Sequence, residues 1–89
     1  MMPSEEIEKL LYTFDLEVNW LWENQFIIRV PELNLAIPGE SYDDAFNALK
    51  KHVGLLYEFL SENESMLGQG PMQLLRILRA HLWRLRERG

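Results

Sequence analysis

The sequence contains no cysteine and is poor in basic residues, and both shortages exclude kinds of protein. Without cysteine there can be no disulfide, no thiolate metal ligand and no cysteine nucleophile. This composition fits a reducing compartment, and we expect a cytoplasmic protein. Nine lysines and arginines are outnumbered by fourteen aspartates and glutamates, so the net charge is −5. An acidic chain of this kind is suited to a basic partner.

Long apolar runs are also missing. No stretch approaches the roughly 18 apolar residues that cross a bilayer, and Glu5 and Glu6 stand where a signal peptide would be basic. We therefore expect neither secretion nor membrane insertion. With 89 residues, 47% of them hydrophobic, the chain predicts one globular domain over residues 1–89. A domain of this size has a modest core and is often stabilised by oligomerisation.

The most regular pattern is an odd–even alternation near the N-terminus. Side chains of a β-strand alternate between two faces, so this pattern predicts a long strand with one buried face. On this interpretation Trp20 and Trp22 lie in the core, although Trp22 becomes an interface residue if the hairpin tip is exposed. The apolar positions are Tyr12, Phe14, Leu16, Val18, Trp20 and Trp22.

Two further strands are predicted, at residues 26–30 and 33–37. A three-residue loop at 23–25 would place Trp22 opposite Phe26 and Trp20 opposite Ile28. The second strand is much shorter than the first, so Tyr12 and Phe14 lack a partner on it. Either the third strand or a second copy of the chain must then pair with that end, which favours a homodimer and makes Tyr12, Phe14 and Trp22 candidate interface residues.

Three helices complete the expected fold. The sequence predicts a short helix within residues 1–11, a long amphipathic helix over 41–63 that begins at the N-cap Ser41, and a helix over 70–88. The sheet occupies residues 12–38. The expected fold class is α+β, with a three-stranded antiparallel sheet (β-β-β) covered by one long helix. A short N-terminal helix and a basic amphipathic C-terminal helix flank this unit.

Three short motifs occur in an informative order: Tyr12-Thr13-Phe14, then Pro31-Glu32-Leu33, then the segment 39–45 that reads Gly-Glu-Ser-Tyr-Asp-Asp-Ala. In this order and spacing the chain resembles the HicB-like antitoxin family over residues 12–60. The family usually has Pro-Gly-Cys where this chain has Asn34-Leu35-Ala36. It often carries a C-terminal DNA-binding domain, whereas this chain ends in a single predicted helix, as in a stand-alone member. The resemblance implies a small basic HicA-type ribonuclease partner, whose RNA site the antitoxin masks.

Charge is unevenly distributed. Residues 1–75 carry four basic and thirteen acidic side chains, whereas residues 76–89 carry five arginines and one glutamate. The arginines could contact phosphates or a partner. The alternative, which we favour, is that they are solvated or paired with the acidic body. They are Arg76, Arg79, Arg84, Arg86 and Arg88.

Candidate catalytic and metal-binding residues are few. Asp43 and Asp44 fall in a first helical turn, where acids complement the helix dipole. His52 and His81 have no evident nucleophile partner, and Asp15 and Glu17 are expected to be solvated. We therefore expect no enzyme, no metal site and no cofactor. The sequence predicts a non-catalytic, dimeric, antitoxin-like protein; a nucleic-acid-binding protein that uses its arginine-rich helix and an orphan structural dimer remain the alternatives.

Overall fold

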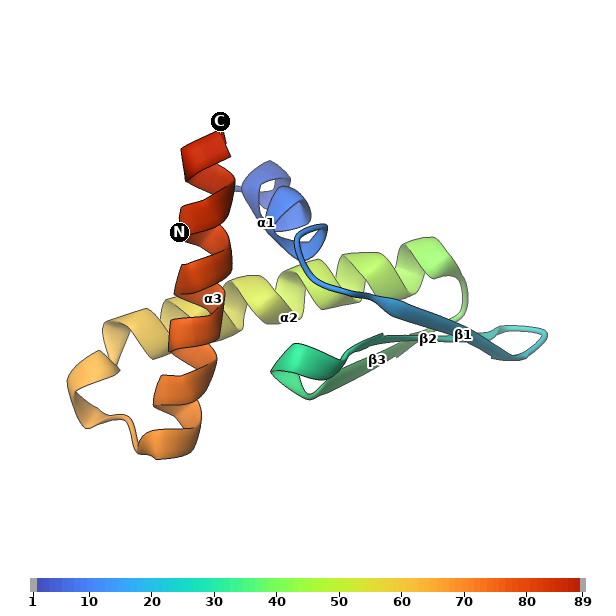
Figure 1. The fold of residues 1–89 in the computed structure, drawn as a ribbon. Helices are drawn as coiled ribbons and strands as arrows, with labels where there is room; N and C mark the ends of the chain where they lie inside the picture. The colour runs from blue at the N-terminus through green and yellow to red at the C-terminus, as the bar shows by residue number, and fades with distance from the viewer. Residues whose placement is uncertain (1, 89) are drawn as a thin grey trace.

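The computed structural model describes residues 2–88 and has the predicted α+β fold (Figure 1). Three antiparallel strands form one sheet in the order β1-β2-β3. Helix α2 packs on this sheet, and helices α1 and α3 pack on α2 and on each other. The elements are α1 (Ser4–Leu11), β1 (Glu17–Trp22), β2 (Gln25–Val30), the short 3-10 turn η1 (Pro31–Leu33), β3 (Leu35–Gly39), α2 (Tyr42–Glu62), the turn η2 (Glu64–Met66) and α3 (Gln69–Arg88).

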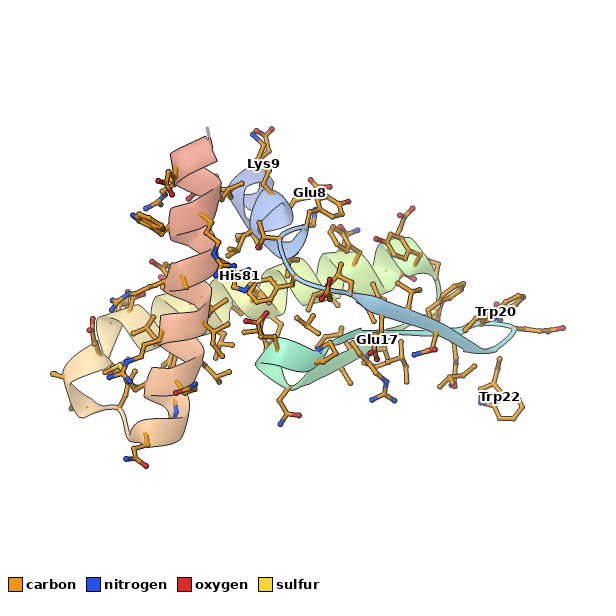
Figure 2. All side chains as sticks on the ribbon, viewed as in Figure 1. Glu8, Lys9, Glu17, Trp20, Trp22 and His81 are labelled. Carbon is orange, nitrogen blue, oxygen red and sulfur yellow. The ribbon has the colours of Figure 1, made fainter. Side chains whose placement is uncertain are left out.

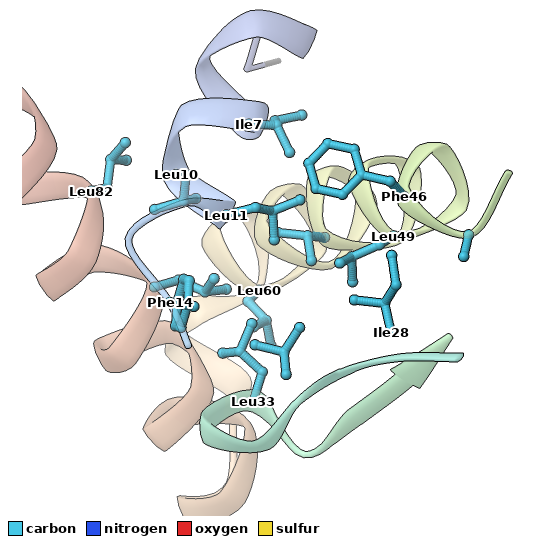
Figure 3. Packing of buried hydrophobic residues seen from close by; sticks show 14 of the residues in the cluster. Ile7, Leu10, Leu11, Phe14, Ile28, Leu33, Phe46, Leu49, Leu60 and Leu82 are labelled. Atoms are coloured by element: carbon cyan, nitrogen blue, oxygen red, sulfur yellow. The ribbon is translucent and has the colours of Figure 1, made fainter. Parts of the chain in front are cut away.

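Helix α2 is the central element, because it contacts the sheet and both other helices. Its start is fixed by Ser41, whose hydroxyl accepts a hydrogen bond from the Asp44 N–H at 3.1 Å. Its buried positions face β2, β3 and α1 over the first half and α3 further along (Figure 3). The core is a single cluster made of Ile7, Leu10, Leu11, Phe14, Ile28, Val30, Leu33, Ala45, Phe46, Leu49, Val53, Leu60, Leu75, Leu78 and Leu82.

The first strand is shorter than the sequence predicts. It begins at Glu17, whereas Tyr12, Thr13 and Phe14 form turns that follow α1, their N–H groups bonding back to carbonyls of Glu8, Leu10 and Leu11. The prediction of one strand from residue 12 to residue 22 is therefore wrong. A second periodicity overlaps the alternation, because apolar residues at 7, 10, 11 and 14 have helical spacing, and these four side chains are the buried ones.

The predicted hairpin register is also wrong. Only Glu23 and Asn24 form the turn, and Trp20 lies opposite Phe26 rather than opposite Ile28. Pairing is irregular between Trp20 and Trp22, so that one extra residue is accommodated in β1 as a bulge. This irregularity allows a turn shorter than the sequence pattern alone suggests.

Candidate interaction surface

Strand β1 is an open, apolar edge of the sheet. It pairs with β2 on one side and forms the end of the strand order, so its other side has no strand neighbour among residues 2–88. All six of its residues are exposed. We call the four apolar ones, together with their backbone, the β1 edge: Val18, Trp20, Leu21 and Trp22, which are 47%, 67%, 49% and 71% exposed.

The edge is exposed because α2 does not extend over it. Val18 lies opposite Ile28, so both side chains point to the same face of the sheet, yet Ile28 is fully buried beneath α2 while Val18 is half exposed. Helix α2 packs mainly on β2 and β3. The expectation that Trp20 and Trp22 lie in the core is therefore wrong.

Aromatic rings line the helix-facing side of this region in two groups. Trp20 stacks on Phe26, with ring centroids 5.9 Å apart and planes 4° from parallel. Tyr12 and Tyr42 stack on Phe46 at 5.6 and 5.7 Å. Partial desolvation, followed by the nearby Glu8 carboxylate, raises the pKa of the Tyr12 phenol. Because stacked rings are held in place, little conformational freedom remains to be lost when a partner binds them.

The bulge directs the two tryptophans to opposite faces (Figure 2). Trp22 lies opposite Gln25, on the face that points away from α2, and borders an open hollow of about 620 Å³ together with Ile27 and Pro38. Trp20 faces the helix side. The edge thus offers large apolar side chains on both faces, whereas the sequence predicted that both tryptophans share one face.

The three predicted interface residues have different environments. Tyr12 is 61% exposed and Trp22 71% exposed, so both are accessible. Phe14 is buried at 5% exposure and stacks on the His81 ring at 3.8 Å, so it is a core residue and not a surface one. Sequence reasoning missed Trp20 as a surface residue and did not single out Leu21, which it left among the outward-facing positions. The absence of any charge between Glu17 and Glu23 was the feature that could have revealed them.

A buried histidine connects the start of the sheet to α3. Nε2 of His81 lies 3.0 Å from both carboxylate oxygens of Glu32, and its Nδ1 lies 2.9 Å from the Thr13 hydroxyl. This order of hydroxyl, imidazole and carboxylate resembles a catalytic triad. However, the Thr13 oxygen lies closer to the Leu10 carbonyl, at 2.6 Å, and the imidazole is packed against Phe14. The network therefore fixes the segment that leads into β1.

The C-terminal arginines divide into two groups. Arg79 makes a two-pronged pair with Glu64, at 2.6 and 2.9 Å, and Arg86 pairs with Glu6 at 2.8 Å. Arg76 and Arg84 are exposed and make no ion pair within residues 2–88. The side chain of Arg88 lies outside the described part. Pairing with the acidic body, the interpretation favoured above, thus holds for Arg79 and Arg86.

The Arg79–Glu64 pair should make stability depend on pH in the acid range. The Arg79 hydrogen bond holds the pKa of Glu64 below its ordinary value of 4.5. A depressed carboxyl pKa stabilises the fold at neutral pH, and this contribution disappears as pH falls through the lowered value. We expect Glu64→Gln to be less stable than the native chain at pH 7, and the difference to shrink as the pH is lowered below 4.5, as measured by urea unfolding. Glu40→Gln, at an exposed position without an ion pair in residues 2–88, should show no such convergence.

Within residues 2–88 no group of three or more histidine, aspartate or glutamate side chains is arranged to hold a metal ion. Asp43 and Asp44 are exposed in the first turn of α2, and His52 is exposed on the same helix. Among the described helices, none has the length and apolar content required to cross a membrane.

Comparison of the chain with protein-family models, with curated proteins and with solved structures finds no match.

Proposed function

We propose that this protein is a non-catalytic binding module of the HicB-like antitoxin type, which dimerises and masks a small basic ribonuclease of the HicA type. The β1 edge carries this proposal, because a contiguous exposed apolar strand is a typical protein-binding feature. The β-β-β-α order supports it, as do the motifs of residues 12–45. The acidic body, with four basic and thirteen acidic side chains in residues 1–75, would attract a basic nuclease and compete with RNA for its surface.

The dimer is proposed to form through a second apolar stripe on α2, on the side away from the core. Leu55 and Phe59 are 55% and 60% exposed and lie one helical turn apart. Antiparallel packing of two copies about a two-fold axis would set Leu55 against Phe59 of the second copy. The same arrangement would bring Lys51 near Glu62 of the second copy, so the charges beside the stripe are complementary.

Light scattering coupled to size-exclusion chromatography, together with an RNA-cleavage assay, tests this function. The purified chain is measured alone and after co-expression with a small basic protein encoded by the adjacent reading frame. We expect a dimer alone, a stable complex with the basic protein, and loss of that protein's RNA cleavage in the complex. Phe59→Glu should give a monomer that still binds, because it changes α2 and not the β1 edge. No complex, or a complex that still cleaves RNA, would contradict the proposal.

A nucleic-acid-binding function is the competing proposal, and one observation favours it. Trp83 is 65% exposed on α3, next in sequence to the unpaired Arg84 and about two helical turns after the unpaired Arg76, an arrangement that could stack a base and contact phosphates. Binding of single-stranded RNA by the chain alone, weakening steeply with salt, would support this alternative. Arg76→Gln/Arg84→Gln should then abolish binding, whereas no RNA binding at low salt would remove the alternative.

A further inference from the structure

We propose that the β1 edge binds an extended peptide segment as a fourth strand of the sheet, and that this segment is apolar at its centre and basic near both ends. The inference builds on the proposed function only in taking the chain to be a binding module. It does not require the partner to be a ribonuclease. It assigns the contact to one edge of one strand and gives the chemistry of the segment that fits it.

The first support is the weak protection of this sheet edge. Exposed edge strands normally carry charges, a proline, a bulge or a cover that prevents strand addition. Strand β1 has one charge, Glu17 at its first position, and a bulge after Trp20, whereas its remaining residues are uncharged and all exposed: Val18, Asn19, Trp20, Leu21 and Trp22. The opposite edge differs, because β3 ends in Pro38 and Gly39. Strand addition is therefore expected at β1 and not at β3.

The second support is the placement of side chains on both faces. Alternate residues of an added strand would lie beside Val18 and Trp20 on the helix side, where the Trp20 ring is already held against Phe26. Residues pointing the other way would lie toward Trp22 and the hollow that it borders. Backbone hydrogen bonds would supply affinity, and these aromatic contacts would favour apolar residues at the centre of the segment.

The third support is charge. Asp15 and Glu17 precede the apolar residues and Glu23 follows them, so an acid stands near each end of the edge. Arg29 of β2 lies opposite Glu17, and no lysine or arginine occurs in the sequence between Lys9 and Arg29. Opposite charges on paired strands stabilise the pairing, and like charges directly opposite each other destabilise it. A segment with a basic residue near each end therefore fits this edge.

The same charges disfavour pairing of β1 with β1 of a second copy. In an antiparallel pairing about a two-fold axis, the start of one β1 lies beside the end of the other. Asp15 and Glu17 of each copy would then lie near Glu23 of the other copy. The two-fold axis repeats this contact between acids.

Synthetic strand peptides test the inference on the intact protein. The probe is Lys-Val-Thr-Val-Thr-Val-Lys, with a glutamate-ended version and a version N-methylated at alternate residues as controls. Binding is followed by amide chemical shifts of residues 15–30 and by tryptophan fluorescence. We expect shifts concentrated at residues 17–22, binding of the lysine-ended peptide about tenfold tighter than that of the glutamate-ended one, and loss of binding on N-methylation.

Glu23→Lys separates the two possible occupants of the edge, since the residue is exposed in a turn and the variant should fold normally. If a basic segment binds, this change should weaken the lysine-ended peptide about three- to tenfold. If β1 pairs with itself, the change should tighten self-association, because a lysine would then face an acid. Tighter self-association through β1, or equal binding of the two charged peptides, would overturn the inference.

Failure of this inference and failure of the proposed function give different results. A nuclease complex that is unaffected by Leu21→Lys, a change that places a charge on the edge, would overturn strand addition and leave the antitoxin proposal standing. Peptide binding at β1 without any nuclease complex would support strand addition and overturn the antitoxin proposal. Circular dichroism of each variant checks that the fold is retained.

Discussion

Replacing Gly39 with alanine should destabilise the protein by about 2 kcal/mol or more, although it adds only one methyl group. A Cβ at this position would lie 2.4 Å from the backbone nitrogen of Ala45 and 2.7 Å from its Cα. Backbone atoms in a capped helix cannot yield as a flexible side chain does, so β3 and the start of α2 would have to separate. Gly39 is needed for this close approach and not for its φ angle, which is not positive. Urea unfolding followed by circular dichroism measures the loss.

Two other glycines provide controls for this prediction. Gly68→Ala adds a methyl group with no atom within 4 Å, and should change stability by less than about 0.5 kcal/mol. Gly54→Ala places a Cβ 2.8 Å from the terminal carbon of Ile7, a side chain that can shift, and gains helix propensity within α2. A Gly39 variant as stable as the Gly68 variant would contradict the packing of β3 against α2.

The architecture of this chain was predictable because its helices have strong periodicity and clear boundaries. The helix expected at 41–63 is found as Tyr42–Glu62, and its N-cap Ser41 accepts the expected hydrogen bond. The helix expected at 70–88 begins at Gln69. Capping and a sustained apolar stripe are local features, and they agree here with the tertiary packing, which confirms the predicted fold class.

The extent and exposure of the first strand were not predictable in the same way. Residues 12–16 fit an alternating pattern, yet Phe14 also continues the helical spacing of Ile7, Leu10 and Leu11. The contact of Phe14 with His81, 67 residues further along the chain, favours the second pattern and is not visible in a local window. Likewise, nothing within β1 indicates that α2 covers only its neighbours. An apolar face shows that burial is favourable, but not that a covering element is present.

The candidate site therefore depends on tertiary placement. Trp20 and Trp22 were expected in the core because the alternation puts them on one face with Leu16 and Val18, and their large apolar side chains form an exposed edge once no helix covers β1. The arginines of α3 show the converse. Their clustering left a binding surface open as an alternative to solvation or pairing with the acidic body, and the structure pairs two of the five, with Glu64 and Glu6.

Truncating Leu49 to alanine should cost about 2–5 kcal/mol, a large part of the stability of a domain of this size. Leu49 has no exposed surface and lies on α2 near Ile28 of the sheet and Leu11 of α1 (Figure 3). Its removal would leave a cavity where three elements meet, and neither the capped helix nor the paired strands can close it without losing other contacts. We expect the melting temperature to fall by about 10 °C or more.

Leu55→Ala is the matched control, because it makes the same substitution in the same helix at a side chain that is 55% exposed. It should change monomer stability by less than about 1 kcal/mol. The two variants differ further if α2 forms the dimer interface. Leu55→Ala should then weaken dimerisation, as measured by light scattering, and leave the stability of the monomer unchanged. Leu49→Ala should lower the stability of the monomer and of the dimer. Equal losses of monomer stability at the two positions would mean that α2 presents a different face to the sheet. The exposure of the β1 edge follows from the position of α2, so that result would contradict the exposed edge as well.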